Sequence, residues 1–131
     1  MGQQRPPRPE RPSRTSTGRR GEDLACEELT RRGYEIVARN WRCPVGEVDI
    51  VAREGQSLAF VEVKTRRGRQ SLPEEGLTPA KAARIIAVAQ HYVGQVEPIE
   101  TAWRIDLVAI ELGRDGQARR ITITPAIGID A

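Results

Sequence analysis

The sequence has few of the residues that build the commonest metal and redox centres. Its 131 residues include a single histidine, His91, and two cysteines, Cys26 and Cys43. One histidine excludes HExxH metalloproteases and histidine-rich zinc sites, and the cysteine spacing matches no metal or redox motif. We therefore expect two reduced thiols, as is usual in a cytoplasmic protein.

Aromatic residues and long apolar runs are also scarce. Aromatic residues make up 4% of the chain, which argues against binding of single-stranded nucleic acid by stacked rings. No apolar run approaches the roughly 18 residues that a membrane span needs. The N-terminus is rich in Arg and Pro and lacks the apolar core of a secretory signal. We expect a cytoplasmic protein that is not inserted in a membrane.

Positive charge is concentrated at the N-terminus. The chain carries a net charge of +3, of which residues 1–20 contribute +5 and the remainder −2. Residues 1–17 contain one hydrophobic residue, Met1, and four prolines, so this segment cannot bury enough apolar surface to fold. We predict a disordered basic tail over 1–17 and a single domain over 18–131. The tail either holds a polyphosphate backbone or promotes solubility, and its composition favours neither role.

Hydrophobic periodicity predicts the secondary structure of the domain. Helices are expected over 18–32 and 79–93, and strands over 34–41, 45–52, 58–65, 102–112 and 120–124. The polar segment 66–77 is expected to be a loop. The element order α-β-β-β-α-β-β predicts an α/β (α+β) fold with a single mixed β-sheet flanked by helices.

The predicted hairpin formed by the strands over 45–52 and 58–65 contains the residues of greatest chemical interest. Its alternation predicts one wholly apolar face and a second face with Glu47, Asp49, Glu62 and Lys64. A two-residue turn at Gly55-Gln56 would set Asp49 opposite Glu62 and Glu47 opposite Lys64.

Two carboxylates in directly opposed positions destabilise a hairpin unless something compensates their charge. A hard divalent cation does so, because Mg²⁺ or Mn²⁺ binds carboxylate and carbonyl oxygens. Asp49, Glu62 and the backbone carbonyl of Val63 are the predicted ligands. The alternative is a solvated sheet face with a Glu47–Lys64 ion pair.

Lys64 is one of only two lysines among 21 basic residues, the other being Lys81. A lysine ammonium can give up its proton, whereas an arginine guanidinium stays protonated. Lys64 is therefore predicted to orient or deprotonate an attacking water, or to neutralise charge that develops on a phosphate.

The order of these residues resembles a known nuclease signature. Asp49 followed by Glu62-Val63-Lys64 is similar to the core of the PD-(D/E)XK superfamily, with Val48 in place of the motif's proline. Together with the segments 18–22, 40–42, 46–49 and 60–66, it resembles the YraN family of small bacterial proteins. The resemblance implies a restriction-endonuclease-like fold similar to that of archaeal Holliday-junction resolvases. It also implies metal ligation by Asp49 and Glu62, a catalytic Lys64 and a contributing carboxylate from Glu22.

Several basic residues are candidates for contacts with nucleic acid. They are Arg66, Arg67 and Arg69 directly after the predicted site, and Lys81 and Arg84 on the second helix. The alternative for each group is a solvated loop or helix face.

Four other features have simpler structural explanations. Arg104 and Asp106 point to the same strand face and are expected to pair, and Trp41 and Trp103 are expected to pack in or around the core. The apolar end of the last strand, Ile121–Ile129, is a candidate surface for a homodimer.

Three functions remain open from the sequence. The first is a Mg²⁺- or Mn²⁺-dependent endodeoxyribonuclease acting on DNA, with a branched or structured substrate suggested by fold analogy. The second is a non-catalytic nucleic-acid-binding module with the same fold, and the third is a structural protein whose acidic cluster has no ligand. Metal binding separates the first from the third, and cleavage separates the first from the second.

Overall fold

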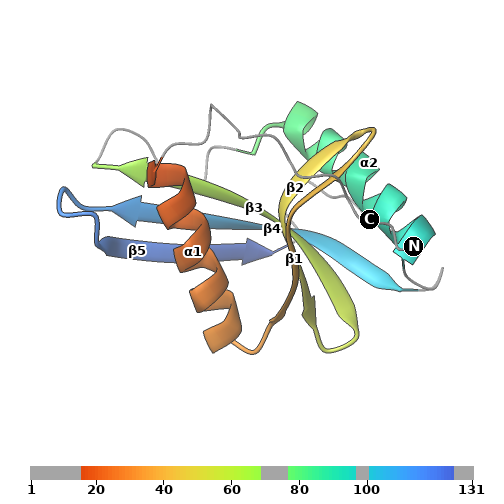
Figure 1. Ribbon diagram of the computed structural model, residues 1–131, viewed down its shortest axis with the longest axis horizontal. Coiled ribbons are helices and arrows are strands. Elements are labelled where there is room, and N and C mark those ends of the chain that lie inside the picture. Colours follow the sequence, from red (N-terminus) through yellow and green to blue (C-terminus); the bar gives the residue numbers. More distant parts are fainter. Residues whose placement is uncertain (1–15, 69–76, 97–100, 126–131) are drawn as a thin grey trace, which may run out of the picture.

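The computed structural model describes residues 16–68, 77–96 and 101–125. Two helices and five strands follow one another along the chain in the predicted order (Figure 1). They are α1 (Ser16–Arg31), β1 (Glu35–Cys43), β2 (Gly46–Glu54), β3 (Ser57–Arg67), α2 (Pro79–Val96), β4 (Ala102–Leu112) and β5 (Ala118–Pro125). The predicted α+β class with a single mixed sheet is therefore confirmed.

The five strands lie in the sheet in their sequence order. Neighbouring strands are antiparallel except β3 and β4, which are parallel. A parallel pair requires a crossover, and α2 lies in the segment that connects the two strands. Consequently β3 is the central strand, and one edge of the sheet is β1 while the other is β5.

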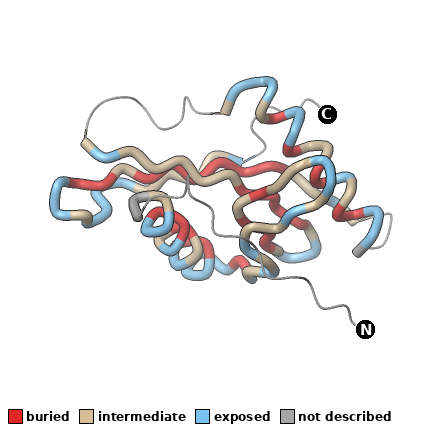
Figure 2. The backbone as a smooth tube through the Cα atoms, turned by 45° about the horizontal axis from the view of Figure 1, so that its top comes forward, coloured by how far each residue is buried: buried red, intermediate tan, exposed pale blue. Residues whose placement is uncertain are grey.

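The two helices cover opposite faces of the sheet. Ala59 and Val61 of β3 pack in the core that α1 completes, whereas Leu58 and Phe60 pack in the core that α2 completes. Side chains alternate between the faces of a strand, so each helix buries one of these two sets. Buried residues run along the strands, and exposed residues lie at the turns and along the helices (Figure 2).

One expectation for the hairpin is wrong. Only one of its faces was expected to be apolar, yet Val51, Leu58 and Phe60, on the face that was expected to be polar, are fully buried under α2. The β2–β3 hairpin lies inside the sheet with a helix on each face, so the polar residues are confined to the ends of its strands.

Several predicted boundaries also move. The helix α1 begins at Ser16, which assigns the last two residues of the predicted tail to this helix, and α2 continues past Gly94. Arg66 and Arg67 belong to β3 rather than to a loop, because they pair with Glu111 and Leu112 of β4. At the end of β3, pairing with β4 outweighs the polar composition of the segment. Arg69 and residues 1–15 lie outside the described residues.

The predicted pairing of Arg104 with Asp106 is confirmed and forms part of a larger network around the buried Asp106. Arg104 Nε donates a hydrogen bond to Asp106 Oδ1 over 2.9 Å, and the Tyr34 hydroxyl donates to Asp106 Oδ2 over 3.1 Å. Asp106 is fully buried, and Arg104 also pairs with Glu54 at 2.6 Å. Burial alone lowers the pKa of Arg104, but its hydrogen bonds to Asp106 and Glu54 outweigh burial and raise that pKa above the ordinary value. The network joins β4 to the end of β2 and to the start of β1.

The tryptophans pack as expected. Trp41 meets Tyr92 of α2 edge to face with ring centroids 4.9 Å apart, and Trp103 meets Phe60 at 5.8 Å. These contacts join both tryptophans to the core beneath α2. Cys26 and Cys43 are free thiols. Neither helix in the described ranges is long and apolar enough to cross a membrane.

A close approach between α1 and β3 makes Gly21 sensitive to substitution. A Cβ atom at this position would lie 1.9 Å from Thr65 Oγ1 and 3.0 Å from Thr65 Cβ. We expect Gly21→Ala to lower the free energy of unfolding by about 1–3 kcal/mol, because the packed strand cannot move aside freely. Urea unfolding measures this change.

The matched control for Gly21→Ala is the same substitution in a Thr65→Ala background. Removal of Oγ1 relieves the shortest contact. Gly21→Ala should therefore lower the free energy of unfolding less in the Thr65→Ala background than in the wild type. Equal costs in the two backgrounds would contradict the steric explanation.

Candidate functional site

The candidate site lies where β2 and β3 stop pairing. The predicted register is confirmed from Glu54 opposite Ser57 to Ile50 opposite Val61, and Gly55 in the turn has the expected positive φ of 60°. In the described strands the pairing of β2 with β3 ends at Ile50 and Val61. The predicted pairing of Asp49 with Glu62 is therefore not formed. The separation of the two strands opens space for both carboxylates.

Asp49 reaches across this opening with its side chain. The backbone N–H of Val63 donates a hydrogen bond to Asp49 Oδ2 over 2.8 Å. The carboxylate thus takes the place of the strand carbonyl that would otherwise accept from β3. This contact fixes Asp49 beside the Glu62-Val63-Lys64 segment, and it explains why the ladder can end without leaving the Val63 N–H unsatisfied.

Glu47 has a different partner from the predicted one. It faces Arg42 across the β1–β2 hairpin, and Arg42 Nε lies 3.0 Å from Glu47 Oε1. The charged groups that act on Lys64 are instead Lys81, Glu62 and Arg66. The predicted Glu47–Lys64 rung is replaced because β2 and β3 have already separated at that level.

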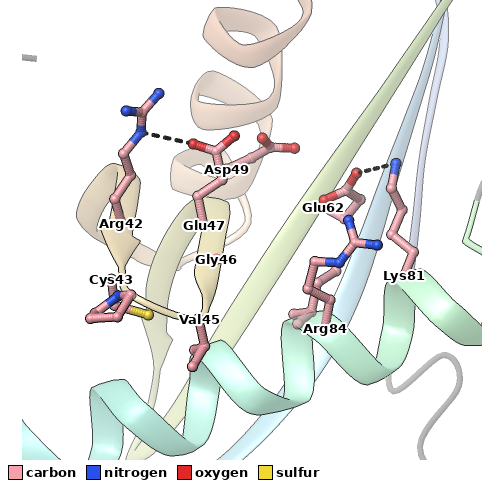
Figure 3. Close-up of a pocket in the computed structure, with 11 residues that line it drawn as sticks. Arg42, Cys43, Val45, Gly46, Glu47, Asp49, Glu62, Lys81 and Arg84 are labelled. Carbon is pink, nitrogen blue, oxygen red and sulfur yellow. Dashed lines mark hydrogen bonds and ion pairs between the residues drawn. The ribbon is translucent and has the colours of Figure 1, made fainter. Parts of the chain in front are cut away.

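A pocket of about 540 Å³ lies between the β1–β2 turn, the separated strands and the first half of α2. Asp49 and Glu62 line it from β2 and β3, and Lys81 and Arg84 line it from α2 (Figure 3). The remaining lining residues are Arg42, Cys43, Pro44, Val45, Gly46, Glu47 and Ile85. Four of the predicted site residues therefore meet in one pocket, with carboxylates from the sheet facing cations from the helix.

One of these cations is bound to one of these carboxylates. Lys81 Nζ lies 3.3 Å from Glu62 Oε2, and the side chains are 34% and 13% exposed respectively. The solvated helix face that was the alternative for Lys81 is thus replaced by an ion pair at the pocket wall. Arg84 is exposed and follows Lys81 by one turn on the same side of α2.

Lys64 lies in the same charged environment. Burial lowers the pKa of the Lys64 ammonium, and the nearby Lys81 ammonium lowers it further, against an opposing effect of Glu62. A lower pKa means that the ammonium releases its proton more readily than an exposed lysine does. Lys64 is therefore suited to proton transfer as well as to charge neutralisation.

Glu22 is buried and is held against β1. The helix begins six residues before it, so Glu22 is not in the first turn, and its placement does not serve the helix dipole. It lies on the inward side of α1 with Ala25 and Leu29 and is 4% exposed. Asn40 Nδ2 donates to Glu22 Oε1 over 3.3 Å, and Arg39 lies 3.6 Å from the same oxygen.

Sequence reasoning assigned no role to Asn40. It is the one non-glycine residue with a positive φ, 52°, in the part of the chain that the structure describes. Asparagine tolerates this conformation better than most residues, and here its amide reaches Glu22. The signal in the sequence was its place in the Asn-Trp-Arg segment at 40–42.

The basic residues at the end of β3 differ in their surroundings. Arg66 donates to the carbonyl of Thr65 over 3.1 Å, while Arg67 donates to the carbonyls of Gly113 and Arg114 over 3.2 and 3.4 Å. Arg67 therefore fastens the β4–β5 turn. Arg69, the third predicted phosphate contact, is not among the described residues.

The chemistry of the pocket can be compared with the needs of a metal ion. The described residues contain no group of three or more His, Cys, Asp or Glu side chains placed to hold a metal together. Mg²⁺ keeps several waters and binds through one or two carboxylates, which a pair such as Asp49 and Glu62 supplies. The Lys81 ammonium lies beside Glu62, so a monovalent cation already contacts one of these two carboxylates. The two carboxylates thus fit a largely hydrated Mg²⁺ or Mn²⁺.

The chain belongs to the uncharacterised protein family UPF0102, whose model matches residues 21–110. This membership confirms the resemblance to the YraN family. A UPF0102 protein of Roseiflexus castenholzii is 48% identical over 114 residues, covering 86% of this chain and 92% of the relative. A UPF0102 protein of Chloroflexus aurantiacus is 49% identical over 94 residues, covering 71% of this chain and 77% of the relative.

Among solved structures, the chain is similar to Pyrococcus furiosus SfsA, determined in complex with Ca²⁺. The TM-score is 0.40 and the sequence identity 14%, and the match covers 84% of this chain and 64% of that protein.

Proposed function

We propose that this protein is a metal-dependent nuclease that hydrolyses phosphodiester bonds in DNA. The observation that carries the proposal is the pocket in which Asp49 and Glu62 face Lys81 and Arg84. Paired carboxylates suit a divalent cation, and flanking cations suit the phosphates of a nucleic-acid backbone. The order Asp49, Glu62, Lys64 along two adjacent strands, which resembles the PD-(D/E)XK core, supports the same reaction.

Each residue has a distinct part in this proposal. Asp49 and Glu62, with the Val63 carbonyl, hold Mg²⁺ or Mn²⁺, which when bound makes water a better nucleophile and neutralises phosphate charge. Asp49 is oriented for this role by the Val63 N–H. Lys64 takes a proton from the attacking water or balances charge on the phosphate, and its lowered pKa suits the first role.

The remaining candidates act on the substrate or on the scaffold. Arg84 and Arg66 contact phosphates, and Arg67 keeps the adjoining β4–β5 turn in place. Glu22 is included in the proposed constellation through the family resemblance, and its buried carboxylate contacts Arg39 and Asn40 of β1. By fold analogy the substrate is a branched or otherwise structured DNA, which a homodimer with two sites would cut on both strands.

Cleavage assays test this proposal. End-labelled linear, flapped and four-way DNA substrates would be incubated with the wild-type chain in Mg²⁺, in Mn²⁺ and in excess EDTA. We expect cutting of at least one substrate that requires the metal and stops on chelation. Cutting that persists in EDTA would contradict metal-dependent hydrolysis, and no cutting of any substrate in either metal would contradict the assigned reaction.

A second function is supported by the Lys81–Glu62 ion pair. This pair neutralises one carboxylate without any metal ion, as a nucleic-acid-binding module without catalytic activity would require. Such a module would bind the same DNA substrates equally well with and without Mg²⁺ and would leave them intact.

A further inference from the structure

Lys81 occupies an unusual place on its helix. It lies in the first turn of α2, whose N-terminus is capped by Thr78 Oγ1, which accepts a hydrogen bond from the Lys81 N–H over 3.1 Å. The first turn of α2 contains no acidic residue. The positive end of the helix dipole favours acidic residues there and disfavours a cation. A feature that breaks a local rule for helix stability is expected at a functional position.

The side chain of Lys81 points toward the candidate metal position. Its ammonium lies 3.3 Å from Glu62 Oε2, and the Glu62 side chain is largely buried at 13% exposure. Lys64 places a second ammonium nearby, so two positive charges share the neighbourhood of one carboxylate. Two close ammonium groups repel each other, which makes this arrangement easy to replace by another cation.

The structure of the lysine side chain allows such a replacement. Its ammonium is at the end of a flexible four-carbon stem, and about a third of the side chain is exposed, so it can swing into solvent while the capped backbone stays in place. A divalent ion brings twice the charge to the same oxygen and can also use Asp49, which lines the same pocket.

We propose that Lys81 is the resident cation of this site: its ammonium holds Glu62 while no metal ion is bound and leaves that carboxylate when a divalent ion enters. The inference rests on the proposed function, since it assigns the metal to Asp49 and Glu62. Lys81 thereby sets the metal concentration at which the site becomes loaded. Below that concentration, Glu62 stays neutralised and in place.

Calorimetric titration of Mn²⁺ into the full chain, without DNA, tests the exchange. Lys81→Met keeps most of the length of the side chain and removes its charge, and Lys81→Gln is a second variant in case the first folds poorly. We expect both to bind Mn²⁺ about three- to tenfold more tightly than the wild type, because the metal no longer displaces or faces an ammonium. Thermal unfolding of each variant establishes that the fold is intact.

The matched control is Arg114→Gln. It also removes one positive charge, but Arg114 is an exposed residue of the β4–β5 turn, at the opposite end of the molecule from α2 (Figure 1). The Mn²⁺ affinity of Arg114→Gln should equal that of the wild type. This result would show that the effect of the Lys81 variants comes from the site and not from the lower net charge of the chain.

Two further outcomes would overturn the inference in distinguishable ways. If Asp49→Asn abolishes Mn²⁺ binding while both Lys81 variants bind no more tightly than the wild type, the metal site stands and the resident cation is rejected. If the wild type shows no saturable Mn²⁺ binding, the proposed function and the inference both fail.

Discussion

We expect the Lys64→Met variant to cut DNA about 10²–10⁴-fold more slowly than the wild type, the usual contribution of a positioned acid or base. Its Mn²⁺ affinity should not fall, because Lys64 is a positive neighbour of Glu62 and not a ligand. Single-turnover cleavage and calorimetry on the same samples measure the two effects separately. Loss of both together would mean that the substitution damages the site as a whole.

The Lys64→Arg variant distinguishes the two roles left open for this residue. A guanidinium keeps the positive charge but does not give up a proton. If Lys64 takes the proton from water, Lys64→Arg should be as slow as Lys64→Met, whereas charge balance alone would leave most of the rate. Cleavage by Lys64→Met within threefold of the wild type would contradict any catalytic part for Lys64.

The second large effect concerns stability. We expect Asp106→Ala to lower the free energy of unfolding by about 3–5 kcal/mol, because the change removes the buried member of a charge pair and the acceptor to which Arg104 and Tyr34 donate. Asp106 is fully buried and accepts hydrogen bonds from Arg104 and Tyr34. Arg104 retains its contact with Glu54, so the loss should fall toward the lower end of this range. Chemical unfolding measures the difference.

Tyr34→Phe is the matched control for the buried network. It removes the hydroxyl that donates to Asp106 and accepts from Arg104, and it leaves the charge pair intact, so it should cost about 2 kcal/mol, as two hydrogen bonds do. Burial raises the pKa of this tyrosine, and Asp106 raises it further, so the hydroxyl remains a donor at neutral pH. If Asp106→Ala costs no more than Tyr34→Phe, the ion pair does not stabilise the fold.

Much of the fold could be predicted because its determinants are local. The turn at Gly55-Gln56 fixes the register of β2 against β3, and every pair from Glu54–Ser57 to Ile50–Val61 follows from it. Thr78 and Pro79 likewise mark the start of α2. These signals depend on neighbouring residues, which the sequence displays directly.

Other features depend on contacts between distant segments. Arg66 and Arg67 extend β3 because β4, about 45 residues later, pairs with them in parallel. Polar composition alone predicted a loop there. The second buried face of the hairpin has the same origin, since the sequence does not reveal that α2 covers Val51 and Phe60.

Four of the residues selected from the sequence, Asp49, Glu62, Lys81 and Arg84, line the pocket, but their arrangement was not predicted. Asp49 and Glu62 line one pocket, yet they do so where the strands separate rather than as a rung of the ladder. Because the strands separate, Glu47 forms an ion pair with Arg42, and Lys64 lies near Lys81. The Lys81–Glu62 ion pair joins α2 to β3. The two residues lie far apart in the sequence, so no spacing rule predicts their contact.

The most direct test of the account is a calorimetric titration of Mn²⁺ into the wild type and into the Asp49→Asn, Glu62→Gln double variant. We predict saturable binding by the wild type that disappears in the double variant, with the fold preserved in both as judged by thermal unfolding. Equal binding by the two proteins would place the metal elsewhere. An absence of binding by the wild type at millimolar Mn²⁺ would contradict the central claim that these two carboxylates form a metal site.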